Sequence, residues 1–114
     1  ACVVRVVVEE VKLAARAHFG CGTLPGPEVE NQPTGGGCVP AGSHWEQRVF
    51  NSELMASTAV GLHEKLSAVT LALMEASGWY RANYSAADAW VRGRDWGFQQ
   101  GCGFARREKC IQTQ

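Results

Sequence analysis

Residues 62–80 constrain the fold of this chain most. Their apolar residues recur at alternating steps of four and three, which is the spacing of one face of a helix. These residues are Leu62, Leu66, Val69, Leu73, Ala76 and Tyr80. Further apolar residues lie on the other faces: Ala68, Leu71, Ala72 and Met74. A helix that is apolar on more than one face is stable only when it is buried. We therefore predict a core helix over 62–80, with Thr58 as its N-cap and Gly78 near its end.

A second helix is predicted over 9–19. Apolar residues at helical spacing begin at Val8 and Val11, two glutamates open the segment, and Gly20 follows it as a stop. His18 falls in the last turn, where the helix dipole favours a positive charge. Before this helix, the β-branched run 3–8 is either a short strand or the lead into the helix. Residues 85–90 are expected to add one more helical turn.

Loops make up most of the remaining sequence. Residues 22–43 contain all four prolines of the chain and a run of three glycines, which predicts a long irregular loop. Cys21 and Cys38 flank most of this loop and favour one that is tied down. Residues 91–103 are predicted to form another loop, anchored by Trp96 and Phe98. The expected fold class is mainly α with long irregular loops, stapled by disulfides.

Length and charge exclude several classes of protein. The 114 residues suffice for one small domain. Eleven basic residues balance eleven acidic ones, so nothing in the charge indicates a nucleic-acid partner. No apolar run approaches the roughly 18 residues that a transmembrane helix needs. The charged fraction of 19% is rather low, so part of the surface is expected to be buried elsewhere.

Five widely spaced cysteines point to an oxidising compartment. None belongs to a Cys-x-x-Cys pair, so a zinc ribbon or a thioredoxin-like motif is not indicated. Scattered cysteines are typical of disulfides in secreted or cell-surface proteins. The odd count leaves at least one cysteine without a partner within the chain. Asn83-Tyr84-Ser85 is an N-glycosylation sequon and agrees with the same location.

The three histidines do not form a helical zinc clamp. His18, His44 and His63 include no pair at i,i+4, and the segment around His63 has Ser67 where a second histidine would stand. We assign no metal role to His18 or His63, and Cys21 is read as a disulfide cysteine rather than as a nucleophile. His44 differs, because Met55 follows eleven residues later and a buried helix comes next. This order is typical of a metzincin, in which the third zinc histidine precedes a Met-turn.

Motifs along nearly the whole chain carry a closer resemblance. They are ARAHFGC (15–21), EVENQ (28–32), AGSHWEQR (41–48), ELM (53–55), SAVTLA (67–72), GWYRANYS (78–85), WG (96–97) and GC (101–102). With these motifs in this order, the chain resembles leishmanolysin, the zinc metalloprotease of trypanosomatid cell surfaces. The resemblance implies a partial metzincin-type zincin domain, a zinc cofactor and protein or peptide substrates. It also implies a cell-surface or extracellular location, a role in adhesion, and a lipid anchor that this chain does not contain.

The resemblance assigns roles to particular residues. His44 matches the third zinc ligand, and Met55 matches the methionine that packs beneath the metal without binding it. Cys21 and Cys102 match a family disulfide, and Cys110 matches a cysteine whose partner lies further downstream. Cys2 and Cys38 match no family cysteine; either they pair with each other or they are peculiar to this chain.

The main departure from the family pattern is the missing His-Glu-x-x-His motif. Without it, the first two zinc ligands and the general-base glutamate are absent, so no catalytic residue is expected in this chain. We interpret residues 1–114 as the C-terminal part of a catalytic domain, inactive by itself. Residues 1–43 would be the end of an inserted segment and a loop, 44–55 the third histidine to the Met-turn, 58–80 the core helix, and 81–114 the start of a C-terminal region. The alternative is a non-catalytic surface or adhesion protein derived from the same fold.

Overall fold

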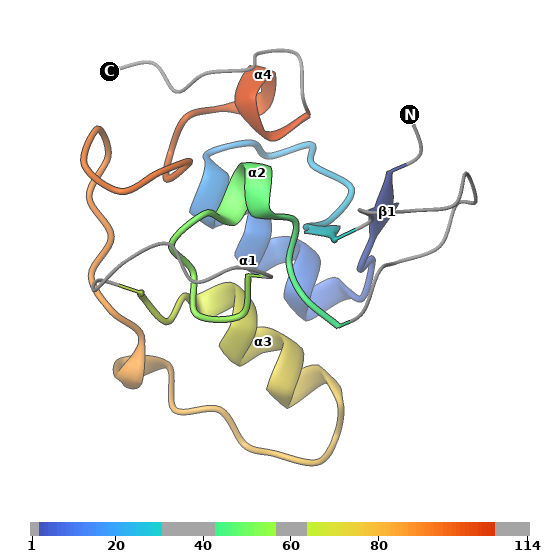
Figure 1. Ribbon diagram of the computed structural model, residues 1–114. Coiled ribbons are helices and arrows are strands. Elements are labelled where there is room, and N and C mark those ends of the chain that lie inside the picture. Colours follow the sequence, from blue (N-terminus) through green and yellow to red (C-terminus); the bar gives the residue numbers. More distant parts are fainter. Residues whose placement is uncertain (1–2, 31–42, 57–63, 107–114) are drawn as a thin grey trace.

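The computed structural model describes residues 3–30, 43–56 and 64–106, and shows a mixed, mostly helical small domain (Figure 1). In chain order its elements are β1 (Val4–Arg5), α1 (Glu9–Phe19), β2 (Glu28–Val29), α2 (Gln47–Phe50), α3 (Ala68–Ala76), the 3-10 turn η1 (Tyr84–Ala86) and α4 (Cys102–Ala105). In Figure 1, α4 lies at one end of the molecule and α3 at the other, with α1 and α2 between them.

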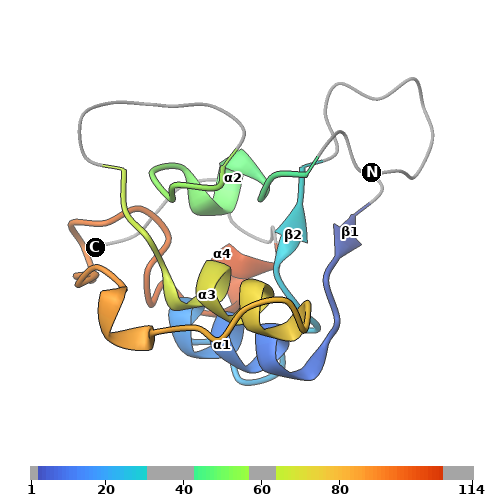
Figure 2. The same ribbon diagram turned by 90° about the horizontal axis from the view of Figure 1, so that it is seen from below.

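Helix α1 confirms the predicted helix 9–19 at both ends. Gly20 adopts a left-handed conformation with φ of 69°, and its N–H donates to the carbonyl of Arg16, which ends the helix. Val11, Ala15 and Phe19 are fully buried on one face. This face packs against α3, which runs beside α1 in Figure 2.

The predicted helix 62–80 is wrong in its length. Helix α3 spans only Ala68–Ala76, and Ser67 is its N-cap, with Oγ accepting a hydrogen bond from the Thr70 N–H. The backbone before the helix is extended and pairs with residues 52–54 instead. The N–H of Lys65 donates to the Ser52 carbonyl, and the N–H of Leu54 donates to the Lys65 carbonyl. Gly78 follows the helix with φ of 79°, as its predicted place at the end requires. The proposed cap Thr58 lies outside the described residues.

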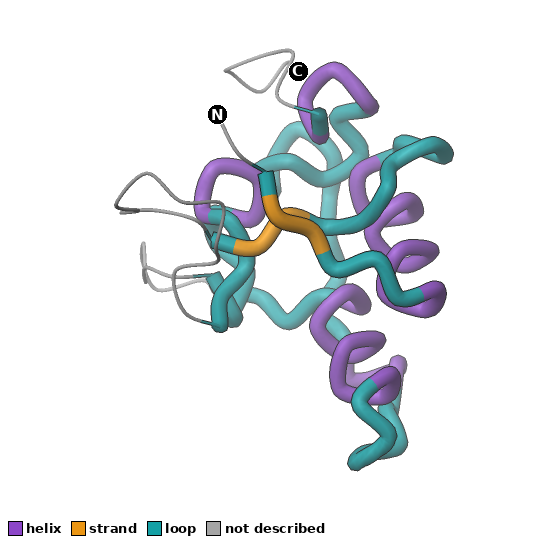
Figure 3. Tube along the Cα trace, turned by 90° about the vertical axis from the view of Figure 1, so that its right-hand side faces the viewer, coloured by secondary structure: helices purple, strands orange, loops and turns teal. Residues whose placement is uncertain are grey.

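Helix α3 is also less buried than predicted. Val69, Thr70 and Ala72 face the core, but Met74 is 36% exposed. The loop that follows exposes Trp79 by 84% and Tyr80 by 63%. In Figure 3, α3 and this loop project from the rest of the described chain. One apolar side of α3 is therefore open to solvent in this structure.

Short extended segments hold the other side of the molecule together. β1 pairs with β2 in antiparallel fashion, with Val4 opposite Val29 and Arg5 opposite Glu28. The run 3–8 is thus a strand at Val4–Arg5 and a lead into α1 afterwards. Trp45 forms single bridges both to Val29 and to Ala56, so it lies between β2 and the turn at residues 53–56. β2 itself corrects the prediction of an entirely irregular loop over 22–43, of which residues 31–42 lie outside the described chain.

The segment after α3 wraps back towards α2. Of the helical turn expected over 85–90, only the short 3-10 turn η1 forms; it begins one residue earlier, ends at Ala86, and is followed by non-helical residues 87–90. Trp96 is an anchor as predicted, because its indole N–H donates to the carbonyl of Arg48 at 2.6 Å. Phe98 is the other anchor and packs against the ring of His18. The predicted loop 91–103 ends early, since α4 already begins at Cys102. No helix within the described segments is long and apolar enough to cross a membrane.

Candidate functional site

The backbone of His44 is held from two sides. The N–H of Glu30, just after β2, donates to the His44 carbonyl at 2.8 Å, and the N–H of Trp45 donates to the Met55 carbonyl at 3.0 Å. The next residue, Glu46, donates its N–H to Glu28 at 2.9 Å. These bonds continue the pairing of β2 and fix the direction in which the chain passes His44. The imidazole itself is exposed.

His44 and Met55 line the same hollow. Its volume is about 170 Å³, and apolar side chains form most of its wall. The lining residues are Val6, Val29, Ser43, His44, Trp45, Met55 and Leu73. We call this the His44 hollow. The structure thus brings together two residues that lie eleven positions apart, with the imidazole at the surface and the thioether half-buried.

A buried carboxylate lies behind the turn that carries Met55. Glu53 is only 2% exposed. Its Oε1 accepts the N–H of Met55 at 2.6 Å, and its Oε2 accepts the N–H of Ser67 at 3.1 Å. The hydroxyls of Ser67 and Thr70 also donate to Oε2, each at 2.5 Å. Thr70 in turn accepts the indole N–H of Trp45 at 2.8 Å. Sequence reasoning missed this network, because its members are far apart along the chain and share no periodic pattern.

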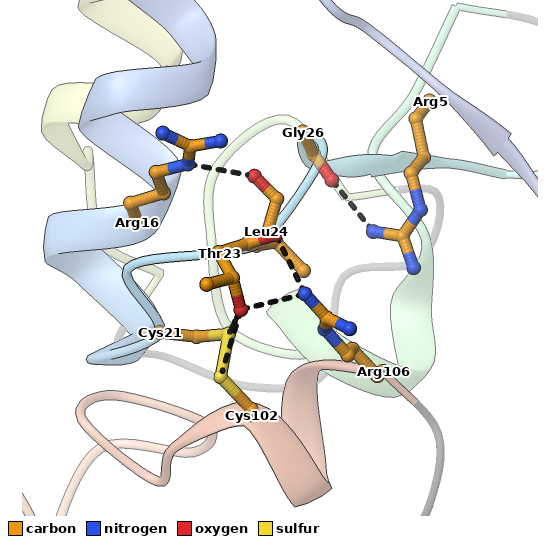
Figure 4. The surroundings of a disulfide bond; sticks show 8 residues. All are labelled: Arg5, Arg16, Cys21, Thr23, Leu24, Gly26, Cys102 and Arg106. Atoms are coloured by element: carbon orange, nitrogen blue, oxygen red, sulfur yellow. Dashed lines mark hydrogen bonds between the residues drawn. A yellow bond between two sulfur atoms is a disulfide. The ribbon is translucent and has the colours of Figure 1, made fainter.

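The Cys21–Cys102 disulfide is present in the structure and joins the end of α1 to the start of α4. The two Cα atoms are 4.8 Å apart, within the normal range for such bonds. Figure 4 shows Thr23 next to the two sulfur atoms, with its side-chain oxygen accepting a hydrogen bond from Arg106 at 2.6 Å. Arg106 also donates to the Thr23 carbonyl, so the loop after α1 is tied to α4 by the disulfide and by hydrogen bonds.

His18 lies in an apolar environment away from the His44 hollow. It is 6% exposed, and its ring contacts four aromatic rings: those of Phe19, Phe50, Trp90 and Phe98. Burial lowers the pKa of His18 from 6.5 to about 4, although the charge of Asp95 opposes part of this shift. The side chain is therefore neutral at pH 7. The expectation that His18 carries a charge favoured by the helix dipole is wrong for this reason.

The remaining candidates are spread over the molecule. Asn83 is exposed, and its side-chain oxygen accepts hydrogen bonds from the N–H of Ser85 at 3.2 Å and from the Ser85 hydroxyl at 2.6 Å. His63, Cys2, Cys38 and Cys110 lie outside the described residues. Within the described segments, no group of three His, Cys, Asp or Glu side chains is placed to hold a metal ion. His44 is therefore not part of such a group in this part of the chain.

Comparison with known proteins places this chain in a family. The sequence profile of leishmanolysin, peptidase family M8, matches residues 2–114. The chain belongs to the leishmanolysin family. It is 46% identical over 102 residues to a leishmanolysin-like peptidase of Drosophila pseudoobscura pseudoobscura, and 40% identical over 102 residues to one of Caenorhabditis elegans. It is 39% identical over 98 residues to leishmanolysin of Leishmania tropica.

These matches cover most of this chain and little of each relative. They include 90% of the chain for the fly and nematode proteins and 86% for the Leishmania tropica leishmanolysin. The same regions are 14% of the first two relatives and 13% of the third. The chain thus spans about one seventh of the length of these leishmanolysin-family proteins. Its sequence matches one region of such proteins.

Proposed function

We propose that this chain is part of a zinc-dependent metalloendopeptidase and that His44 binds the zinc ion. The observation that carries the proposal is the His44 hollow, in which an exposed imidazole and the Met55 side chain meet. The backbone on both sides of His44 is fixed by hydrogen bonds, so the imidazole projects from a defined position. Membership of the leishmanolysin family supports the same assignment.

The residues of this chain fit one ligand position of such a site. An imidazole nitrogen is a normal zinc ligand, and a catalytic zinc takes three protein ligands and leaves one position open. His44 would supply one of these ligands, and the others would come from a His-Glu-x-x-His motif upstream of this chain. When bound, zinc activates water and polarises the peptide carbonyl. Met55 would pack beneath the metal, and Trp45 would hold the two residues together through its hydrogen bond to Met55.

The open side of α3 supports the view that this region belongs to a larger domain. A second hollow, of about 340 Å³, lies there and is almost wholly apolar. Its lining residues are Val8, Leu73, Met74, Ala76, Ser77, Trp79 and Tyr80. It shares Leu73 with the His44 hollow, so the two lie next to each other. Large exposed apolar patches are typical of surfaces that another part of a protein covers.

The division of the chain into 1–43, 44–55, 58–80 and 81–114 remains our proposal for this domain region.

We also propose that the protein acts on protein or peptide substrates at the cell surface or outside the cell. The Cys21–Cys102 disulfide supports this location, since such bonds persist in oxidising compartments. Membrane attachment through a lipid anchor and a role in adhesion remain expectations from the family. A non-catalytic adhesion protein with this fold would keep the disulfide but would not need zinc at His44.

The test is the His44→Ala variant of the full-length polypeptide that contains this chain. We expect bound zinc to be lost and proteolysis of a casein substrate to fall at least about a hundredfold, because a catalytic zinc needs all its protein ligands. Zinc content by mass spectrometry and the rate of casein cleavage are the measurements. His63→Ala is the matched control and should retain both. Full proteolysis in the His44→Ala variant would overturn the assignment.

A separate prediction concerns Asn83. Its side chain is exposed at the start of η1, so it is accessible for attachment of an oligosaccharide. We expect the protein from a secretory eukaryotic host to carry an N-glycan at this residue. Treatment with an N-glycosidase should lower its mass, and Asn83→Gln should abolish that change. Ser85→Thr is the control, because it keeps the sequon and the glycan. An unglycosylated parent protein would contradict the prediction.

A further inference from the structure

We propose that Glu53 is the positioning residue of the metal site: it holds Met55 and Trp45, and through Trp45 the ligand His44, in their places. This inference rests on the proposed function of His44. Glu53 is one of the most deeply buried acidic side chains in the described residues, yet its four hydrogen-bond donors are all uncharged. A charge buried in this way is stable only when every bond to it is made.

The two carboxylate oxygens serve different elements. Oε1 binds the N–H of Met55 and so sets the turn that carries the methionine. Oε2 binds the N–H of Ser67 and the hydroxyls of Ser67 and Thr70, all at the start of α3. One side chain thus joins the turn beneath the His44 hollow to the helix that packs on α1.

The hydrogen bonds of Glu53 act on His44 through the adjacent residue, Trp45. Thr70 donates its hydroxyl proton to Glu53 and accepts the indole N–H of Trp45, which is 1% exposed. Trp45 follows His44 directly, and its own N–H binds the Met55 carbonyl. Trp45 is therefore held at its ring and at its backbone, and both contacts lead back to Glu53. Residues that orient metal ligands in this way commonly change metal affinity by 10- to 100-fold when they are replaced.

Glu53→Gln removes the carboxylate and one of its hydrogen bonds at nearly constant shape. Each carboxylate oxygen faces a backbone N–H, of Met55 or of Ser67, and neither N–H can become an acceptor. The amide NH₂ of glutamine must therefore face one of them, and that bond is lost whichever way the side chain turns. Thr70→Val removes the link to Trp45 at nearly constant shape, whereas Thr70→Ser keeps its hydroxyl.

The experiment measures zinc affinity of the full-length polypeptide by competition with a chelator, together with hydrogen exchange of the segment that contains Met55. We expect Glu53→Gln to weaken zinc binding about 10-fold or more and to speed exchange at Met55. Thr70→Val should weaken zinc binding several-fold, and Thr70→Ser should restore it. Val69→Ala, in the same helix but outside the network, controls for lost stability and should leave zinc affinity within about twofold.

The outcomes separate the two proposals. Unchanged zinc affinity in both Glu53→Gln and Thr70→Val, while His44→Ala abolishes binding, would overturn the role of Glu53 alone. An equal loss in Val69→Ala would also overturn it, since the effect would then follow stability. If Glu53→Gln does not fold, the difference in zinc affinity between Thr70→Val and Thr70→Ser tests the proposal instead. If His44→Ala binds zinc as the parent does, the proposed function fails, and the positioning role, which rests on it, fails with it.

Discussion

Replacing Cys21 and Cys102 together by alanine should lower the free energy of unfolding by about 4 to 5 kcal/mol. The bond closes a loop between residues 81 positions apart, so its loss returns much conformational entropy to the unfolded chain. A small domain is stable by only about 5 to 15 kcal/mol, so this variant should be close to unfolding at room temperature. Urea denaturation of the oxidised chain, followed by circular dichroism, measures the difference.

The matched control is the double variant Cys2→Ala/Cys38→Ala, which removes two cysteines and leaves the Cys21–Cys102 bond intact. It should lose less stability than the first variant. The contacts of Arg106 with Thr23 join the same two segments but are too few to replace the covalent bond. Equal urea midpoints for the parent chain and the Cys21→Ala/Cys102→Ala variant would contradict the account.

Acidification should destabilise the chain between pH 6.5 and pH 4 through His18. The pKa of His18 is about 4 in the folded state and near 6.5 when the residue is exposed in the unfolded state. The unfolded state therefore binds the proton more readily, so stability is complete above pH 6.5 and falls as the pH is lowered towards 4. The full loss is about 3 kcal/mol and levels off below pH 4. Urea midpoints measured across this range give the slope.

His18→Phe tests the cause, because phenylalanine keeps an aromatic ring among the four neighbouring rings and does not titrate. The slope between pH 6.5 and pH 4 should largely disappear in this variant and persist in the His44→Ala control. Burial raises the pKa of Asp95, but hydrogen bonds from Lys65 and the Val91 N–H outweigh it and hold the pKa below 3.8. Protonation of Asp95, which also destabilises the fold, therefore occurs below the pH range over which His18 titrates. A slope that survives His18→Phe would contradict the account.

The sequence predicts elements whose ends are set locally. Helix α1 is delimited by acidic residues at its start and by Gly20 at its end, and both signals act within one turn of the chain. The start of α3 is different. Residues 64–66 lie within the predicted helix, but the backbone of Lys65 binds Ser52 and Leu54 and that of Leu66 binds Asp88, and these tertiary contacts override the local preference.

The candidate site, too, is predictable from the sequence only in part. The order of His44, Met55 and a following helix is visible in the sequence, and the structure places the first two in one hollow. Their placement in this hollow, however, depends on Trp45, which bridges β2 and Ala56. The buried partners of Glu53 and the aromatic rings around His18 come from distant segments, so only the folded chain reveals them.

The central claim is that the imidazole of His44 binds zinc in the full-length protein. Anomalous diffraction at the zinc absorption edge, from crystals of that protein, tests it most directly. The account predicts a single strong peak about 2.0 to 2.1 Å from an imidazole nitrogen of His44, above Met55. A zinc peak held by other residues, with His44 turned away from it, would contradict the account.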